Sequence, residues 1–118
     1  MADLLTLIKK LLNHVPNRTD IDVNPFIDGG VEYFYENLNY SIDYWKGQNG
    51  YTISLHISER NPLHCLNHMT IEVSEKDYME IKWKCEEWNK YLKEQQLNQF
   101  EEFVNGFENN SMDELLND

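Results

Sequence analysis

The chain has few cysteines, no long apolar run and no basic residues at its start, and each shortage excludes a class of protein. Cys65 and Cys85 are its two cysteines among 118 residues, too few for a disulfide-stapled scaffold. No apolar stretch approaches the roughly 20 residues that a membrane-spanning helix needs. The first residues lack the basic segment and cleavage site of a secretory signal. The sequence therefore predicts a protein of the reducing cytoplasm that has no membrane partner.

Basic residues are also absent from two long segments. Residues 19–45 contain six acids and residues 94–118 contain seven, and neither segment contains a Lys or Arg. These segments carry a charge of −13 in a chain whose net charge is −11, so the remainder is slightly basic. Acidic surfaces repel nucleic acid and anionic membranes and attract basic surfaces. We therefore expect a basic protein partner and no direct binding of nucleic acid, the alternative being that the charge serves solubility alone.

The clearest structural pattern is a helix predicted from Ser74 to about Gln95. Its apolar residues recur at alternating steps of three and four, which places them on one face of a helix. They are Tyr78, Ile81, Cys85, Trp88 and Leu92. Ser74 is a good N-cap residue for its first turn. A second apolar stripe, from Leu97 to Phe107, is offset from the first and predicts a break or bend at residues 94–98, followed by one or two shorter helices.

An antiparallel sheet is predicted before this helix. Apolar and polar residues alternate with a period of two at 38–45, 51–58 and 68–73, and 31–35 is a short aromatic run. Residues 3–15 form an amphipathic helix that Pro16 ends. We predict one α+β domain spanning residues 1–118, with its last ten or so residues frayed. It would have an N-terminal helix, an antiparallel meander of about four strands, and C-terminal helices packed on one sheet face.

Histidine and cysteine gather in one region, at His64, Cys65 and His68, with His56 on the preceding strand. These residue types bind zinc, but their spacing matches no common zinc pattern. We therefore predict no metal and no cofactor, and keep these four residues as the weak candidates. Because neighbours on a strand point to opposite faces, Cys65 and His64 cannot readily form a nucleophile–base pair.

Aromatic residues are interleaved with acids between Tyr33 and Tyr51, a pattern that favours a protein interface over base stacking, since Lys and Arg are missing there. Trp83 points away from the core stripe; we expect the C-terminal helix to fold back over it, the alternative being an exposed binding anchor. The predicted partner-binding residues are the acids and aromatics of these regions: Asp20, Asp22, Asp28, Glu32, Tyr33, Tyr35, Glu36, Asp43, Trp45, Trp83, Glu101, Glu102 and Glu108.

The sequence contains no phosphate loop, nucleophile elbow or dinucleotide fingerprint, so no catalytic residue is predicted. We predict a non-enzymatic inhibitor that occupies the positively charged surface of a nuclease or another nucleic-acid-binding protein. Immunity, anti-restriction and anti-CRISPR proteins are similar to this chain in small size and acidity. Two alternatives remain open: a homodimeric acidic chaperone of the secretion type for one client, and a small metal-dependent enzyme that uses the region from His64 to His68.

Overall fold

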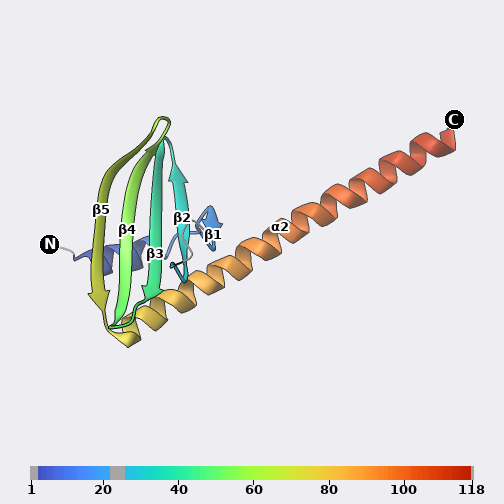
Figure 1. Cartoon of the computed structure of the whole chain (residues 1–118). Helices are drawn as coiled ribbons and strands as arrows, with labels where there is room; N and C mark the ends of the chain where they lie inside the picture. Colours follow the sequence, from blue (N-terminus) through green and yellow to red (C-terminus); the bar gives the residue numbers. More distant parts are fainter. Residues whose placement is uncertain (1–2, 22–25, 118) are drawn as a thin grey trace.

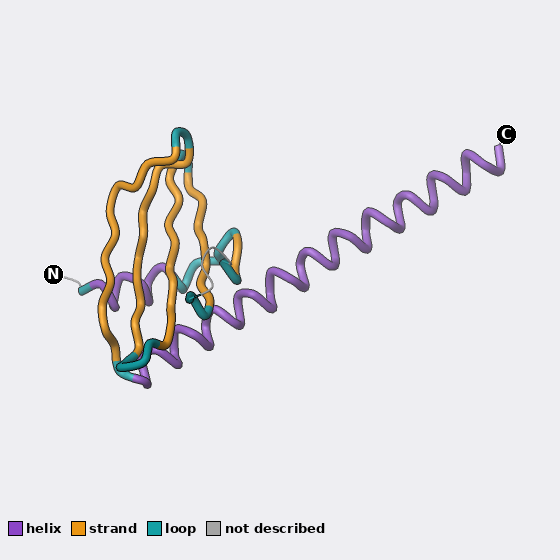
Figure 2. The backbone as a smooth tube through the Cα atoms, in the orientation of Figure 1, coloured by secondary structure: helices purple, strands orange, loops and turns teal. Residues whose placement is uncertain are grey.

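The computed structural model describes residues 3–21 and 26–117, with side chains as far as residue 109. Two helices and five strands follow one another along the chain (Figure 1). Their bounds are α1 Leu4–Leu11, β1 Arg18–Thr19, β2 Gly29–Tyr35, β3 Leu38–Lys46, β4 Tyr51–Arg60, β5 Leu63–Val73 and α2 Glu75–Asn117. The molecule measures 67 × 32 × 28 Å, and α2 extends far beyond the sheet (Figure 2).

The sheet is an antiparallel meander whose strands lie in sequence order, β1 to β5. The predicted α+β class is confirmed, with five strands instead of about four, because the two residues of β1 pair with β2. Strand β5 begins at Leu63, five residues before the predicted start at His68. It pairs with β4 as far as Arg60, which reduces the turn between them to Asn61 and Pro62.

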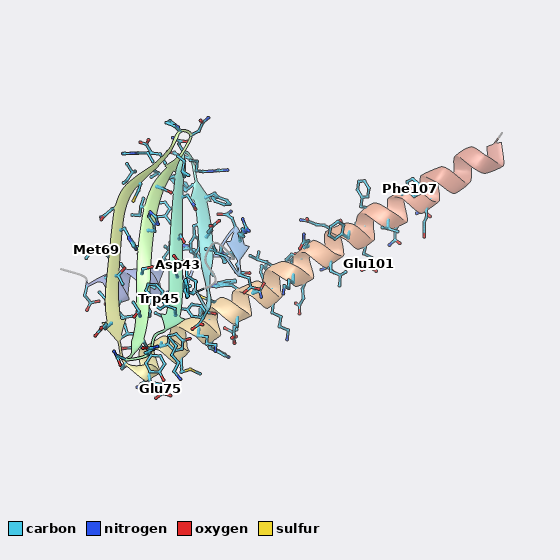
Figure 3. The ribbon with its side chains drawn as sticks, viewed as in Figure 1. Asp43, Trp45, Met69, Glu75, Glu101 and Phe107 are labelled. Atoms are coloured by element: carbon cyan, nitrogen blue, oxygen red, sulfur yellow. The ribbon has the colours of Figure 1, made fainter. Side chains whose placement is uncertain are left out.

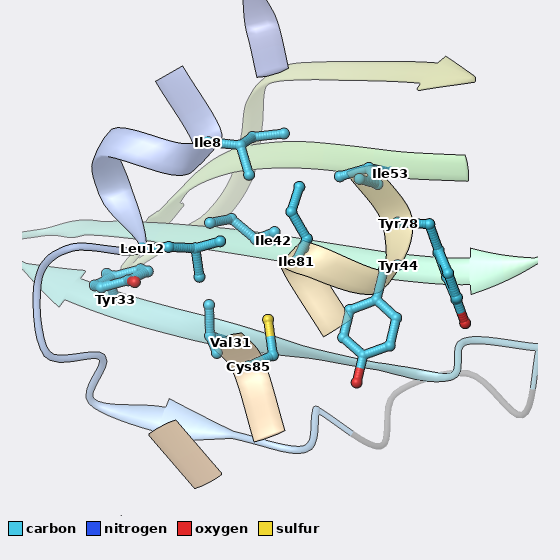
Figure 4. Close-up of a cluster of buried hydrophobic side chains, with 10 residues drawn as sticks. All are labelled: Ile8, Leu12, Val31, Tyr33, Ile42, Tyr44, Ile53, Tyr78, Ile81 and Cys85. Carbon is cyan, nitrogen blue, oxygen red and sulfur yellow. The ribbon is translucent and has the colours of Figure 1, made fainter. Parts of the chain in front are cut away.

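A single buried cluster joins both helices to the sheet (Figure 4). Its members are Ile8 and Leu12 from the α1 region, Val31, Tyr33, Ile42, Tyr44 and Ile53 from the sheet, and Tyr78, Ile81 and Cys85 from α2. The sheet residues are separated by even numbers within each strand, so their side chains share one face. The opposite face carries the polar residues of β3 and β4, and we call it the open face.

Directed contacts fix the angle at which α2 crosses the sheet. The Tyr78 ring meets the Tyr44 ring edge-on, with the two centroids 5.7 Å apart. The Tyr78 hydroxyl donates to Asp28 Oδ2 at 2.6 Å, and Trp88 Nε1 donates to the Leu12 carbonyl oxygen at 2.7 Å. These bonds tie the first half of α2 to the loop before β2 and to the end of α1.

The predicted start of α2 is confirmed, and its predicted break is wrong. Ser74 Oγ accepts a hydrogen bond from the Asp77 backbone N–H at 3.2 Å, as an N-cap does. Beyond residue 94 the helix continues without interruption to Asn117, so the separate C-terminal helices are absent. The segment 94–98 has no proline or glycine and includes Gln95 and Gln96, which are good helix formers. The second apolar stripe therefore faces a different side of the same continuous helix, and the offset between the stripes requires no break in the backbone.

Ile81→Ala should test the contribution of the buried cluster. Ile81 is 1% exposed, so its truncation leaves a cavity in the core and should lower the free energy of unfolding by about 2–5 kcal/mol. Met79→Ala is the matched control on the same helix, because Met79 is half exposed and its loss should cost within about 0.5 kcal/mol. Urea unfolding followed by circular dichroism measures both, and equal losses would contradict this core.

Candidate protein-binding surface

The second half of α2 leaves the sheet and lies in solvent. Every residue from 94 to 109 is exposed, and we call this segment the arm. Figure 3 shows Glu101 and Phe107 on the part of the helix that projects away from the sheet. The rise of a helix gives the stretch from residue 93 to residue 117 a length of roughly 35 Å. The arm therefore exposes its whole circumference to solvent.

Five large apolar side chains of the arm lie on one side of it. They are Leu97, Phe100, Phe103, Val104 and Phe107, and each is between 50% and 78% exposed. Their steps of three and four residues form one stripe along a helix. Contiguous exposed apolar surface of this kind is typical of an interaction site, since scattered single residues are the usual pattern on a monomer.

Carboxylates flank this apolar stripe. Glu94, Glu101, Glu102 and Glu108 are all exposed, and no Lys or Arg occurs anywhere after Lys93. The ion pairs among the described side chains join other residues and leave these four carboxylates without a cationic partner. The arm thus combines an apolar stripe with an acidic border, the counterpart of an apolar groove with basic edges.

Trp83, on the packed half of α2, is a further large apolar side chain that is exposed. The prediction that a C-terminal helix covers it is wrong, because α2 runs straight and leaves the side chain 61% exposed. The exposure of Trp83 agrees with the alternative interpretation of the sequence, and its role as a binding anchor stays a prediction.

The acids predicted between residues 19 and 45 do not form one surface with the arm. The Asp20 carboxylate accepts a hydrogen bond from the Asn89 amide and lies 3.7 Å from Lys93 Nζ. Asp28 accepts from the Lys46 backbone N–H at 2.8 Å and from the Tyr78 hydroxyl at 2.6 Å. Both carboxylates are bound within the fold, and Asp22 lies outside the described residues.

The predicted aromatic residues of this region are also dispersed. Tyr33 was expected at an interface, but it is 6% exposed in the core and its hydroxyl donates to the His14 carbonyl oxygen at 3.2 Å. The period of two that makes Val31 a core residue places Tyr33 beside it. Tyr35 and Glu36 are exposed at the β2–β3 turn, at the end of the sheet away from the start of α2 (Figure 1). Trp45 is half-buried near the other end of β3.

Glu32 and Asp43 lie in a polar hollow of about 380 Å³ on the open face. Ser41 Oγ donates to Asp43 Oδ1 at 3.2 Å. Burial raises the pKa of the Asp43 carboxyl, and the Ser41 hydrogen bond and the nearby His56 and His68 oppose that shift. Burial also raises the pKa of Glu32. The sequence signal for this hollow is the polar half of the alternation on β3 and β4, which is independent of the acidic segments.

Three of the four weak metal candidates approach one another on the open face. His56 Nε2 lies 3.0 Å from Cys65 Sγ, and the His56 and His68 rings stack with centroids 4.9 Å apart. His64 lies on β5 immediately before Cys65 and joins neither contact, because adjacent strand residues face opposite ways. Within the ranges that the structure describes, no three His, Cys, Asp or Glu side chains are arranged to hold a metal ion.

Comparison of the chain with family models, with curated proteins and with solved structures finds no match. Among the described residues no helix is long and apolar enough to cross a membrane. The cytoplasmic location and the basic partner stay predictions.

Asp43→Asn should change how stability depends on pH. A carboxyl whose pKa is raised by folding holds its proton longer in the folded chain than in the unfolded chain, whose Asp pKa is about 4. Stability of the wild type should therefore fall as pH rises from about 4 through the raised pKa of Asp43. The variant lacks this fall, so its stability relative to wild type should increase with pH and then level off.

Urea unfolding at a series of pH values, from about 3 to 8, measures this difference. Glu101→Gln on the arm is the control, because it removes one exposed carboxylate and should give a difference from wild type that varies little with pH. A difference between Asp43→Asn and wild type that stays constant across the series would contradict the burial of this carboxyl.

Proposed function

We propose that this protein is a non-enzymatic inhibitor that binds a basic, nucleic-acid-handling protein through the arm of α2. The observation that carries the proposal is the exposure of Leu97, Phe100, Phe103, Val104 and Phe107 on a helical segment whose charged residues are all acids. An amphipathic helix whose apolar stripe has no cover within the fold is suited to a groove on another protein. The acidic border favours a groove with Lys and Arg along its edges.

The connection of the arm to the packed half of α2 supports this role. A free helix of this length is marginal in water, because forming its first turn is costly and packing supplies most helical stability in proteins. Here the first turns are formed against the sheet from Tyr78 to Cys85, and the arm propagates from them. A recognition helix that is largely formed before binding loses less conformational entropy when it docks.

Aromatic anchors and carboxylates would contribute differently to the complex. Large aromatic residues at the centre of an interface carry most of the binding free energy, so Phe100, Phe103 and Phe107 would set the dissociation rate. Glu101, Glu102 and Glu108 would steer the approach of a basic partner and make the association rate fall as salt rises.

Inhibition follows from competition for the same cationic residues. Nucleic-acid binding depends chiefly on Lys and Arg side chains that contact phosphates. A groove whose basic edges pair with the arm cannot offer those edges to a phosphate backbone at the same time. The arm would thus block the nucleic-acid path of its partner without a chemical step.

The test compares three versions of the tagged full chain with wild type, in pull-downs from the cells in which the chain is naturally made. Wild type should recover a protein rich in Lys and Arg, which loses nucleic-acid binding when the purified complex forms. F100A/F103A/F107A should weaken that complex by about 100-fold or more, as the loss of central aromatics does. E101Q/E102Q/E108Q should slow association and flatten its salt dependence. Y35A/E36Q, at the distant turn, is the matched surface control and should bind as wild type does.

Circular dichroism and urea midpoints should show that α1, the sheet and the packed half of α2 remain folded in all three variants, because the substituted side chains are exposed. Unchanged binding by the arm variants would overturn the proposal, and so would a partner whose nucleic-acid binding survives in the complex. Light scattering of the purified chain adds a third contrary outcome: dimerisation that F100A/F103A/F107A abolishes, with no loss of partner binding, would assign the stripe to a second copy of this chain.

A further inference from the structure

A thiol and an imidazole meet on the open face, on the side of the sheet opposite α1 and α2. Cys65 is exposed, and its Sγ lies 3.0 Å from Nε2 of the half-buried His56. A nucleophile within hydrogen-bond distance of a base that other groups orient is the recurring geometry of activated thiols. The pair is separate from the arm and takes no part in the proposed inhibition.

An irregularity in strand pairing creates this contact. His56 pairs with His68, and Ser58 pairs with Cys65, with a register shift between Ile57 and Ser58. Cys65 and His68 are three residues apart, so a regular strand would direct them to opposite faces. The extra residue of the bulge returns Cys65 to the face that carries His56. The dyad therefore depends on a backbone feature that no spacing in the sequence reveals.

Neighbouring groups hold the His56 ring in place. The His68 ring stacks on it at a centroid distance of 4.9 Å, and His68 Nε2 is itself 3.3 Å from Thr70 Oγ1. Asp43, on the adjacent strand β3, lines the same hollow as His56 and attracts the protonated imidazole. Ile21, Ile27 and Leu63 also line the hollow, which reaches His56 and offers room next to this imidazole for a small molecule.

We propose that Cys65 is a site of thiol–disulfide exchange with low-molecular-weight disulfides, with His56 as its base. The thiol proton moves from Cys65 Sγ to His56 Nε2. The thiolate attacks one sulfur of the disulfide; a new bond to Cys65 Sγ forms as the original S–S bond breaks. The departing thiolate takes the proton from His56. The product is a mixed disulfide on Cys65, and the incoming disulfide is the oxidant.

The second cysteine provides an internal reference. Cys85 is buried in the core cluster, and burial raises the pKa of its thiol to about 12. A buried, protonated thiol reacts slowly, so Cys85 should remain unmodified until the chain unfolds. His68 and Asp43 act through His56 and are positioning residues. The titratable groups described around the dyad are Glu32, Asp43 and His68, from β2, β3 and β5, and the helices lie on the other face.

The test measures the rate at which the native full chain reacts with 5,5′-dithiobis(2-nitrobenzoate) as a function of pH. One thiol should react quickly in wild type and none in Cys65→Ser. His56→Gln should slow the reaction about tenfold or more near neutral pH, and the gap should close at about pH 10, where a thiol ionises without a base. His64→Gln, at the next position on β5, is the matched control and should react as wild type does. Oxidised glutathione should then add to Cys65 alone, as peptide mass spectrometry would show.

Urea midpoints establish that each variant is folded. The expected reaction of a single fast thiol is measured on the wild-type chain and so does not depend on any variant. Equal rates for wild type and His56→Gln across the pH series would overturn the assignment of His56 as base. Simultaneous reaction of both cysteines, or the absence of a glutathione adduct on Cys65 under native conditions, would overturn the site itself. None of these outcomes bears on the arm, whose test uses different residues and a different readout.

Discussion

The contact between the first half of α2 and the sheet is the constraint on which the rest of this structure depends. Tyr78, Ile81 and Cys85 enter the same buried cluster as residues of β2, β3, β4 and α1. Because the hydrogen bonds of Tyr78 and Trp88 fix the helix against Asp28 and Leu12, they also fix the line along which it leaves the sheet. The arm and the exposure of Trp83 follow from that line.

One helix therefore carries two apolar stripes, of which one is buried and the other is exposed. The stripe from Tyr78 to Cys85 is satisfied within the chain, and the offset stripe from Leu97 to Phe107 is left in solvent. The charge follows the same division, since five lysines accompany five acids at residues 75–93 and no base occurs beyond them. Burial and charge together direct the proposed recognition to the arm, while the open face of the sheet keeps a polar hollow and a thiol–imidazole pair.

The local periodicities of the sequence predicted most of the body of the fold. Alternation identified β3 and β4, and Ser74 with the stripe from Tyr78 identified the start and the buried face of α2. The sequence does not predict the continuity of α2, because an offset between two apolar stripes is also the pattern of two separate helices. A rotation around a straight helix satisfies the same pattern when one stripe has no partner in the chain.

The candidate sites were harder to predict because they depend on which residues the fold covers and on how the strands pair. The arm residues Glu101, Glu102 and Glu108 were selected from charge, but their apolar neighbours were assigned to a covering helix. Tyr33 was selected from composition, although its register beside Val31 makes it a core residue. The approach of Cys65 to His56 requires the bulge opposite Ile57 and Ser58, and a bulge changes which residues share a face without an evident signal in the sequence.

Native-state hydrogen exchange along α2 tests the central claim, that this helix is one continuous element with a packed half and a free half. Amides between Tyr78 and Leu92 should exchange at rates close to those set by global unfolding, because their opening exposes the core. Amides between Leu97 and Phe107 should exchange much faster in the free protein, through local opening of an unpacked helix, and should slow when a partner is bound. Uniform protection along the whole helix in the free protein would contradict the account.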